Sequence, residues 1–136
     1  MDQKEMQQKI MRYQQLQKRM EVMNNRREMF LNRMVEIQST LEALENIENS
    51  KEDEIMLSLG SGVYISAKLS ENNKILMMIG GNIVTDTTLD DAKKTVDEYK
   101  KETEATIEVF EDEIMKYAGE LSELQPEVKA IIEKSR

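Results

Sequence analysis

The sequence of 136 residues contains no cysteine, no histidine and no tryptophan, and it has a single proline, Pro126. Without Cys or His, a thiolate nucleophile, an imidazole base and a Cys/His zinc site are excluded. Disulfide bonds are also excluded, so nothing assigns the chain to an oxidising compartment. No apolar run approaches the roughly 20 residues of a membrane span, and the first residues do not resemble a signal peptide. We therefore expect a soluble, cytoplasmic protein without a cofactor.

Positive charge is in deficit, because 19 Lys and Arg stand against 27 Asp and Glu, which gives a net charge of −8 at pH 7. Binding to nucleic acid needs clustered Lys and Arg, so this chain is a poor general ligand for phosphates. The acidic triplets 52–54 and 111–113 have no EF-hand spacing, and consecutive residues of a helix point in different directions. No metal site and no enzymatic activity are therefore expected.

Glycine is absent from the first part of the chain and concentrated in the middle. Residues 1–49 contain no Gly and no Pro, whereas four of the five glycines lie between residues 50 and 86. Because glycine marks turns, this distribution predicts one structural unit with three parts. These are an N-terminal coiled-coil helix (1–49), a β region (50–86) and a C-terminal coiled-coil helix (87–136).

The first part fits a heptad repeat with its first a position at Met6. Ten of the twelve a and d positions from Met6 to Leu44 are apolar, and the exceptions are Lys9 and Arg27. An apolar seam sustained over six heptads indicates a coiled-coil helix that needs a partner along its length.

A second apolar series runs from Leu89 to Ile131, and it places Tyr99 and Thr103 in its seam. An eleven-residue step from position 96 to position 107 interrupts its heptads. Thr88, with Asp91 three residues later, resembles a capping box. Pro126 has no N–H for a helical hydrogen bond, so we expect it to kink or interrupt the last turns.

The charges of the two helices favour an antiparallel hairpin. Residues 12–33 carry six basic and two acidic side chains, and residues 102–123 carry eight acidic and one basic. Aligning position 47 with position 89 places Arg27 near Glu108 and Asp112, one of which we expect to neutralise it. The alternative is that these charges are solvated, since exposed ion pairs contribute only about 0–1 kcal/mol each.

The middle part predicts four short strands, at 54–59, 62–69, 74–79 and 83–86, joined by turns at 60–62, 70–73 and 80–82. Two isolated hairpins are barely stable in water, and their edges require a partner. We therefore expect them to mediate oligomerisation. The residues expected at that interface are Ile55, Leu57, Leu59, Val63, Ile65, Ala67, Leu69, Ile75, Met77, Ile79 and Ile83.

This order of elements resembles the alpha-class subunit of archaeal prefoldin over almost the whole chain. The residues that carry the resemblance are 55–69, the segment 74–83 with Gly80-Gly81, and the helix start at 88–92. A beta-class subunit would have one hairpin. The resemblance implies a mainly α fold with a small β part, in which an antiparallel two-helix coiled-coil hairpin has two β-hairpins at its base. Those hairpins join an oligomeric β-barrel body.

The resemblance also implies a molecular chaperone subunit that hydrolyses no nucleotide. Archaeal prefoldins are hexamers of two alpha and four beta subunits, whose coiled-coil tips hold non-native proteins and deliver them to a group II chaperonin. Whether the partners are beta subunits or further copies of this chain stays open. Two other functions remain as alternatives, namely a structural protein that forms filaments through its hairpins and a helical arm that binds RNA.

The free helix ends are the expected binding site for unfolded proteins, because no neighbour covers them. Ile10 and Met11 lie off the seam, and either Ile131 or Ile132 must face outward. Methionine, frequent in the first 34 residues, suits surfaces that accept many shapes. The alternative is that these ends fray and have no function. The expected residues are Met1, Met6, Ile10, Met11, Tyr13, Leu124, Val128, Ile131 and Ile132.

Overall fold

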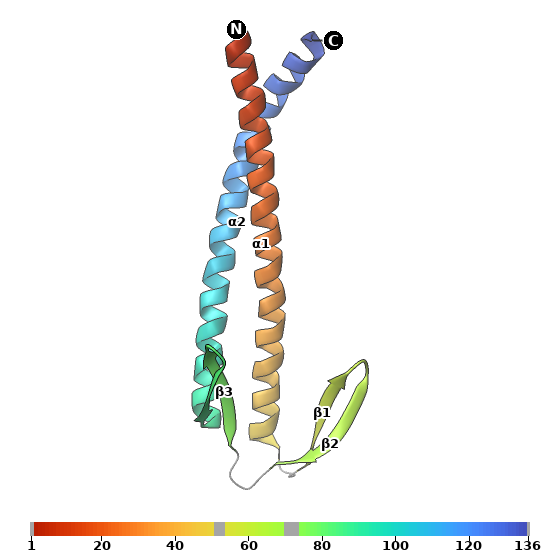
Figure 1. Cartoon of the computed structure of the whole chain (residues 1–136), viewed down its shortest axis with the longest axis vertical. Coiled ribbons are helices and arrows are strands. Elements are labelled where there is room, and N and C mark those ends of the chain that lie inside the picture. Colours follow the sequence, from red (N-terminus) through yellow and green to blue (C-terminus); the bar gives the residue numbers. More distant parts are fainter. Residues whose placement is uncertain (1, 51–53, 70–73, 136) are drawn as a thin grey trace. The chain divides into compact units, whose positions relative to one another are not determined.

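The structure is a computed structural model that describes residues 2–50, 54–69 and 74–135. It confirms the predicted combination of two long helices and two β-hairpins (Figure 1). The turn expected at 70–73 lies outside the described residues. The elements are α1 (Gln3–Asn49), β1 (Glu54–Gly60), β2 (Val63–Lys68), β3 (Ile75–Gly80), β4 (Ile83–Thr87) and α2 (Leu89–Lys134).

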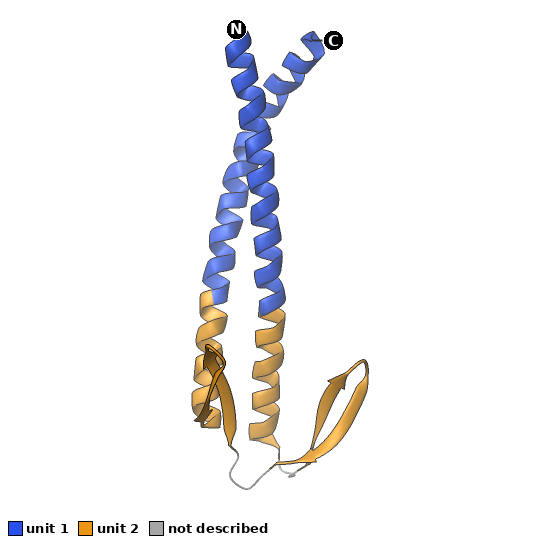
Figure 2. Ribbon diagram, in the orientation of Figure 1, with its two compact units in different colours: residues 1–33, 103–136 blue, residues 34–102 orange. Residues whose placement is uncertain are grey.

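The chain divides into two compact units, each built from part of both helices (Figure 2). Unit 1 contains residues 1–33 and 103–136, and unit 2 contains residues 34–102. No helix within the described ranges is both long and apolar enough to cross a membrane.

Both helices begin at a side chain that caps their first turn. The backbone N–H of Asp91 donates a hydrogen bond of 3.1 Å to Oγ1 of Thr88, which confirms the predicted start of α2. The backbone N–H of Glu5 donates one of 2.8 Å to Oδ1 of Asp2, a cap that the sequence analysis did not identify. Such oxygen atoms satisfy N–H groups that have no partner inside the helix.

The seam of α1 follows the predicted heptads. Every a and d side chain from Met6 to Leu44 is buried or half-buried, including Lys9 and Arg27, and almost every other position is exposed. Leu16, with 0% of its surface exposed, is the largest fully buried side chain among the described residues. The burial of a 3-4 series of positions is the signature of coiled-coil packing.

The seam of α2 departs from prediction at one position. Thr103 is buried as expected, but Tyr99 is 41% exposed, and Lys100 is half-buried. The prediction that Tyr99 belongs to the seam is therefore wrong. The cause is the eleven-residue step, because it rotates the helix relative to a heptad so that the seam passes between positions 99 and 100.

The core of unit 2 joins both helices and one hairpin. Ile37 and Leu44 of α1 form a buried cluster with Ala92 and Val96 of α2. The ammonium group of Lys93 also donates a hydrogen bond to the Glu48 carboxylate, and this bond together with the negative charge of Glu48 raises the pKa of Lys93. Four half-buried residues pack against the cluster, namely Leu41, Ile75, Met77 and Leu89.

Within the described ranges the strands form two separate antiparallel sheets of two strands each. Ser61 and Gly62 connect β1 to β2 with φ values of 53° and 79°, and Gly81 and Asn82 connect β3 to β4 with 54° and 61°. Positive φ at both central residues fits a type I′ turn, whose twist matches that of a hairpin. The two tight turns predicted from glycine and asparagine are thus present.

The helix α2 continues through Pro126 to Lys134, so the proline does not interrupt it. The last turns of α2 lean away from the direction of the turns before them (Figure 1). Such a bend is expected, because proline removes one helical hydrogen bond and its ring crowds the preceding turn.

The cap of α2 generates a stability prediction. Replacing Thr88 with Ala should lower the free energy of unfolding by about 1 kcal/mol, because the Asp91 N–H loses its acceptor, and Thr88→Ser should restore most of it. Denaturant titration of the full chain measures this difference. Thr40→Ala is the control, since Thr40 only donates to the Glu36 carbonyl within a helix and its loss should cost under about 0.5 kcal/mol. Equal stability of Thr88→Ala and the parent would contradict the assignment.

Candidate functional site

In unit 1 the first turns of α1 lie beside the last turns of α2. Nζ of Lys9 is 2.9 Å from Oε2 of Glu127, and Nη2 of Arg12 donates a hydrogen bond of 2.9 Å to Oε2 of Glu120. These contacts confirm the antiparallel pairing of the helices within this unit. They also place the first turns of α1 beside the last turns of α2.

A first groove of about 290 Å³ lies between these helix ends. Ile131 provides a buried apolar surface in it, with 9% exposure. Polar side chains also contribute to its lining, so the groove combines apolar walls with a hydrophilic border. The lining residues are Gln3, Met6, Gln7, Ile10, Ile131, Lys134 and Ser135.

A second groove, of about 370 Å³, lies between Tyr13 of α1 and α2. Val128 is buried here, and Ile132 is 46% exposed. Of the two adjacent isoleucines, Ile131 therefore faces α1 and Ile132 faces outward, as one of them must. The lining residues are Tyr13, Gln125, Val128, Lys129, Ile132 and Glu133.

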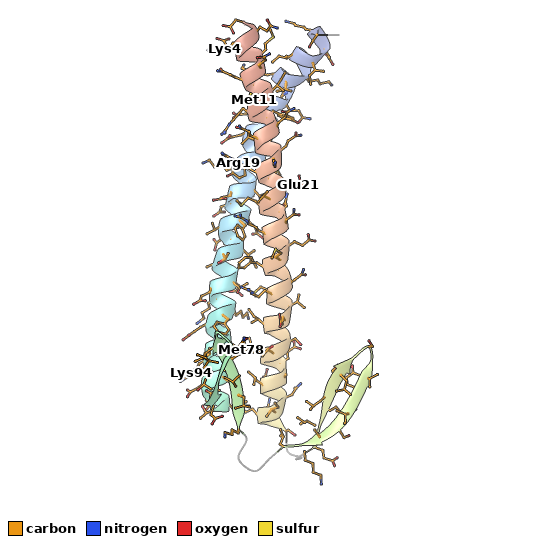
Figure 3. All side chains as sticks on the ribbon, in the orientation of Figure 1. Lys4, Met11, Arg19, Glu21, Met78 and Lys94 are labelled. Atoms are coloured by element: carbon orange, nitrogen blue, oxygen red, sulfur yellow. The ribbon has the colours of Figure 1, made fainter. Side chains whose placement is uncertain are left out.

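Six of the nine expected helix-end residues line one of these grooves. Leu124 is half-buried and lines neither. Met11 also lines neither groove and is 58% exposed on α1, where Figure 3 labels it. Met1 lies outside the described residues. The sequence analysis missed the polar lining residues, such as Lys129 and Glu133. Lys129 stands three residues before Ile132 and four before Glu133, and this spacing was a signal for a shared helix face.

Arg27 has a different partner from the two that were expected. Its Nε donates a hydrogen bond of 3.2 Å to Oε1 of Glu111, so the prediction of Glu108 or Asp112 is wrong. The rings of Phe30 and Phe110 meet edge to face with centroids 5.4 Å apart. The predicted alignment of position 47 with position 89 places Arg27 opposite position 109 and Phe30 opposite position 106. The observed contacts with Glu111 and Phe110 are therefore shifted by two and four residues. A single constant offset between the residue numbers of α1 and α2 cannot describe their pairing, because α2 contains an eleven-residue step while α1 keeps strict heptads.

The hairpins carry a second apolar surface. Six of the expected interface residues are exposed, while Ile75 and Met77 pack against the helices of unit 2 and three others are half-buried. Apolar residues on the alternate positions of the strands are also exposed, which the sequence analysis missed: Met56, Tyr64, Leu76, Met78 and Val84. Figure 3 labels Met78 of β3. Exposed apolar surface of this extent is typical of interaction sites. The six exposed residues are Leu57, Leu59, Val63, Ile65, Ile79 and Ile83.

The described residues of the acidic triplets do not form a metal site. In the part of the chain that the structure describes, no group of three or more His, Cys, Asp or Glu side chains is placed to hold a metal ion. Residues 52 and 53 of the first triplet lie outside the described residues.

A family model for the prefoldin subunit matches residues 13–134. The prefoldin subunit alpha of Thermofilum pendens is 30% identical over 98 residues, which cover 71% of this chain and 75% of that protein. The prefoldin subunit alpha of Pyrococcus horikoshii is 23% identical over 135 residues, covering 98% and 86%. The fold is similar to that of a chain of filamentous PFD from Methanocaldococcus jannaschii, with a TM-score of 0.67, 16% identity, and coverage of 89% and 98%.

The corrected partner of Arg27 can be tested by a double-mutant cycle. The coupling energy between Arg27→Gln and Glu111→Gln should be about 0.3–1 kcal/mol, as for a partly exposed ion pair. The matched cycle with Glu108→Gln should give no coupling, since among the described residues Arg27 forms its ion pair with Glu111 and not with Glu108. Denaturant titration of the full chain measures both. Stronger coupling to Glu108 than to Glu111 would contradict the observed register.

Proposed function

The chain belongs to the prefoldin family of chaperone subunits, and we propose that it binds non-native polypeptides at the free helix ends of unit 1 without hydrolysing nucleotide. One observation carries this proposal most directly. The two grooves between these helix ends have apolar walls that no described residue of unit 1 covers. An unfolded polypeptide is the ligand whose side chains need such a surface.

The composition of the grooves suits ligands of variable sequence. Met6 and Ile10 line one groove, and Tyr13 and Ile132 line the other. Methionine is flexible and polarizable, so it adapts to apolar groups of different shape. Lys129 contributes a positive charge and Glu133 a negative charge to the lining of the second groove. The groove therefore does not repel all client segments of one charge.

Each groove should bind weakly by itself. Complete burial of one apolar side chain contributes roughly 1.5–3 kcal/mol, and ordering the client opposes it. Several subunits holding one client raise the effective affinity, because the later contacts become intramolecular. Binding then lowers the concentration of free unfolded chain by mass action, which requires no energy from nucleotide hydrolysis.

Prefoldins form oligomers with other prefoldin subunits, and the hairpins are the proposed interface in this chain. Their apolar residues are exposed on both alternating sets of strand positions, and each two-stranded sheet has unpaired edges. We propose that the β region, residues 50–86, joins a β-barrel body in a hexamer of two alpha and four beta subunits. The helices at 1–49 and 87–136 then serve as the arms. Delivery of clients to a group II chaperonin belongs to the same proposal, supported by the likeness to archaeal alpha subunits.

A second candidate is a filament of identical copies joined through the hairpins. Two observations favour it, namely the free strand edges and the description of the similar solved structure as filamentous. A closed hexamer has one mass, whereas an open filament is polydisperse. Native mass measurement of the chain, alone and co-expressed with a beta subunit, distinguishes the two.

Client binding is tested by removing apolar groups from both grooves. The variant Ile10→Ser with Ile132→Ser should bind an unfolded client about tenfold more weakly or worse, because each substitution removes apolar contact area. The measurement is light scattering of a denatured client diluted into buffer with the assembled protein. Val109→Ser is the control, since Val109 is exposed but lines neither groove. Undiminished suppression of aggregation by the double variant would refute the helix-end site.

Assembly is tested at the hairpins. The variant Leu59→Lys with Ile83→Lys should abolish oligomers, because it would bury two charges at the proposed interface. Both residues are exposed in the single chain, so its helical circular dichroism should persist. Val35→Lys, an equivalent change at an exposed position of α1, should leave the native mass unchanged. An unaltered native mass of the double variant would contradict the interface.

A further inference from the structure

Four arginines recur at every seventh residue of α1 in unit 1. Arg12, Arg19, Arg26 and Arg33 all occupy heptad position g, which flanks the seam. The c positions between them complete a helical stripe with alternating spacings of three and four. We name this surface the arginine stripe, and it consists of Arg12, Gln15, Arg19, Val22, Arg26, Met29 and Arg33.

Most of the arginine stripe is available for a partner. Arg12 binds Glu120, and the guanidinium of Arg33 lies 5.3 Å from the centre of the Phe30 ring. Arg19, labelled in Figure 3, and Arg26 are exposed and form no ion pair with the residues that the structure describes. Solvation explains isolated surface charges, but it does not explain exposed apolar residues placed between them. Val22 and Met29 are 38% and 69% exposed, and Arg and Met together are enriched at protein interfaces.

A complementary surface lies on α2 of the same unit. Glu104, Glu108, Asp112 and Met115, spaced by four, four and three residues, form what we name the acidic stripe. Its three carboxylates are exposed and form no ion pair within the described ranges. Met115, at 73%, has the highest exposed fraction of the large apolar side chains described.

The two stripes lie on opposite sides of the seam, so the arginine stripe and the acidic stripe of the same chain cannot bind each other. With Ile107 as an a position of α2, Glu113 and Glu120 occupy g positions, and the arginine stripe is on their side of the seam. The acidic stripe is on the side of Glu111 and Ala118, which occupy e positions. In an antiparallel pair of helices, g positions face g positions and e positions face e positions.

We propose that unit 1 of one copy packs beside unit 1 of a second copy, with the arginine stripe of one against the acidic stripe of the other. The positions of the charged residues along the helix axes favour a second copy of this chain, rather than an unrelated acidic protein, as the partner. Within one chain Arg27 is level with Glu111. A second copy that runs in the same direction without axial shift therefore brings Arg26 beside Asp112, Arg33 near Glu104, and Val22 opposite Met115.

The contact has a definite chemistry. Guanidinium groups bind carboxylates through charge-assisted hydrogen bonds, while their aliphatic stems cover the adjacent apolar side chains. Because different surfaces of the two copies meet, the contact is heterologous and leaves one stripe of each outer copy free for a further neighbour.

Cysteine trapping in the full chain tests the proposal, and the absence of native cysteine makes it clean. A chain with Val22→Cys is mixed with a chain with Met115→Cys under mild oxidation, and a disulfide-linked dimer of the two chains is expected. The control replaces Met115→Cys by Val109→Cys. Val109 is 55% exposed on α2, but its c position faces the other side of the seam, so this pair should be trapped several-fold less. Equal trapping at both positions, or none at either, would overturn the proposal.

Charge reversal provides the second measurement. Adding Arg26→Glu and Arg33→Glu to the Val22→Cys chain should abolish trapping by Met115→Cys. Adding Glu104→Arg and Asp112→Arg to the Met115→Cys chain should restore it, because the attraction is then re-formed with the charges exchanged. Arg12 and Arg27 remain unchanged, so the ion pairs within unit 1 are preserved. Trapping that is insensitive to reversal would contradict a contact through the two stripes.

Discussion

The structure depends on the burial of one apolar seam along each of two long helices. Neither seam can be covered by its own helix, and an isolated helix gains too little from backbone hydrogen bonds to persist in water. In unit 1 the seam residues of α1, with Leu16 fully buried, pack against α2, and in unit 2 Ile37 and Leu44 pack against Ala92 and Val96. Antiparallel pairing in unit 1 then places the beginning of α1 beside the end of α2.

The same constraint explains where the chain remains incomplete. A seam between two helices ends where the helices end, so the apolar residues of the last turns border grooves that the described residues of unit 1 leave open. The hairpins are incomplete for a different reason, since two strands cannot bury both of their faces. The family's role as chaperone subunits fits this division, in which one incomplete surface is proposed to bind clients and the other to bind subunits.

Much of the fold follows from local rules that a sequence expresses directly. The heptads of α1, the turns at Gly60–Gly62 and Gly80–Asn82, and the cap at Thr88 each depend on a few neighbouring residues. The outcomes that the sequence did not reveal depend on how two helices meet. Tyr99 lies outside the seam and Arg27 binds Glu111 because an eleven-residue step changes the rotation of α2 relative to α1. Ile75 and Met77 contact the helices of unit 2. The alternation of residues along a strand predicts which side chains share a face, but not which other element that face packs against. At the helix ends, periodicity identified the apolar lining but not the polar residues that border it.

The account rests on antiparallel pairing that keeps the two helix ends of unit 1 together, and one distance tests it. Spin labels attached at Lys4→Cys and Lys134→Cys, in a chain without other cysteines, report that distance by pulsed electron paramagnetic resonance. Paired helices lie about 8–10 Å apart, and the bend of the last turns of α2 widens the gap at Lys134 (Figure 1). The labels should therefore be separated by about 30 Å or less once their own length is included. A separation near 70 Å, roughly the length of a helix of 47 residues, would contradict the account.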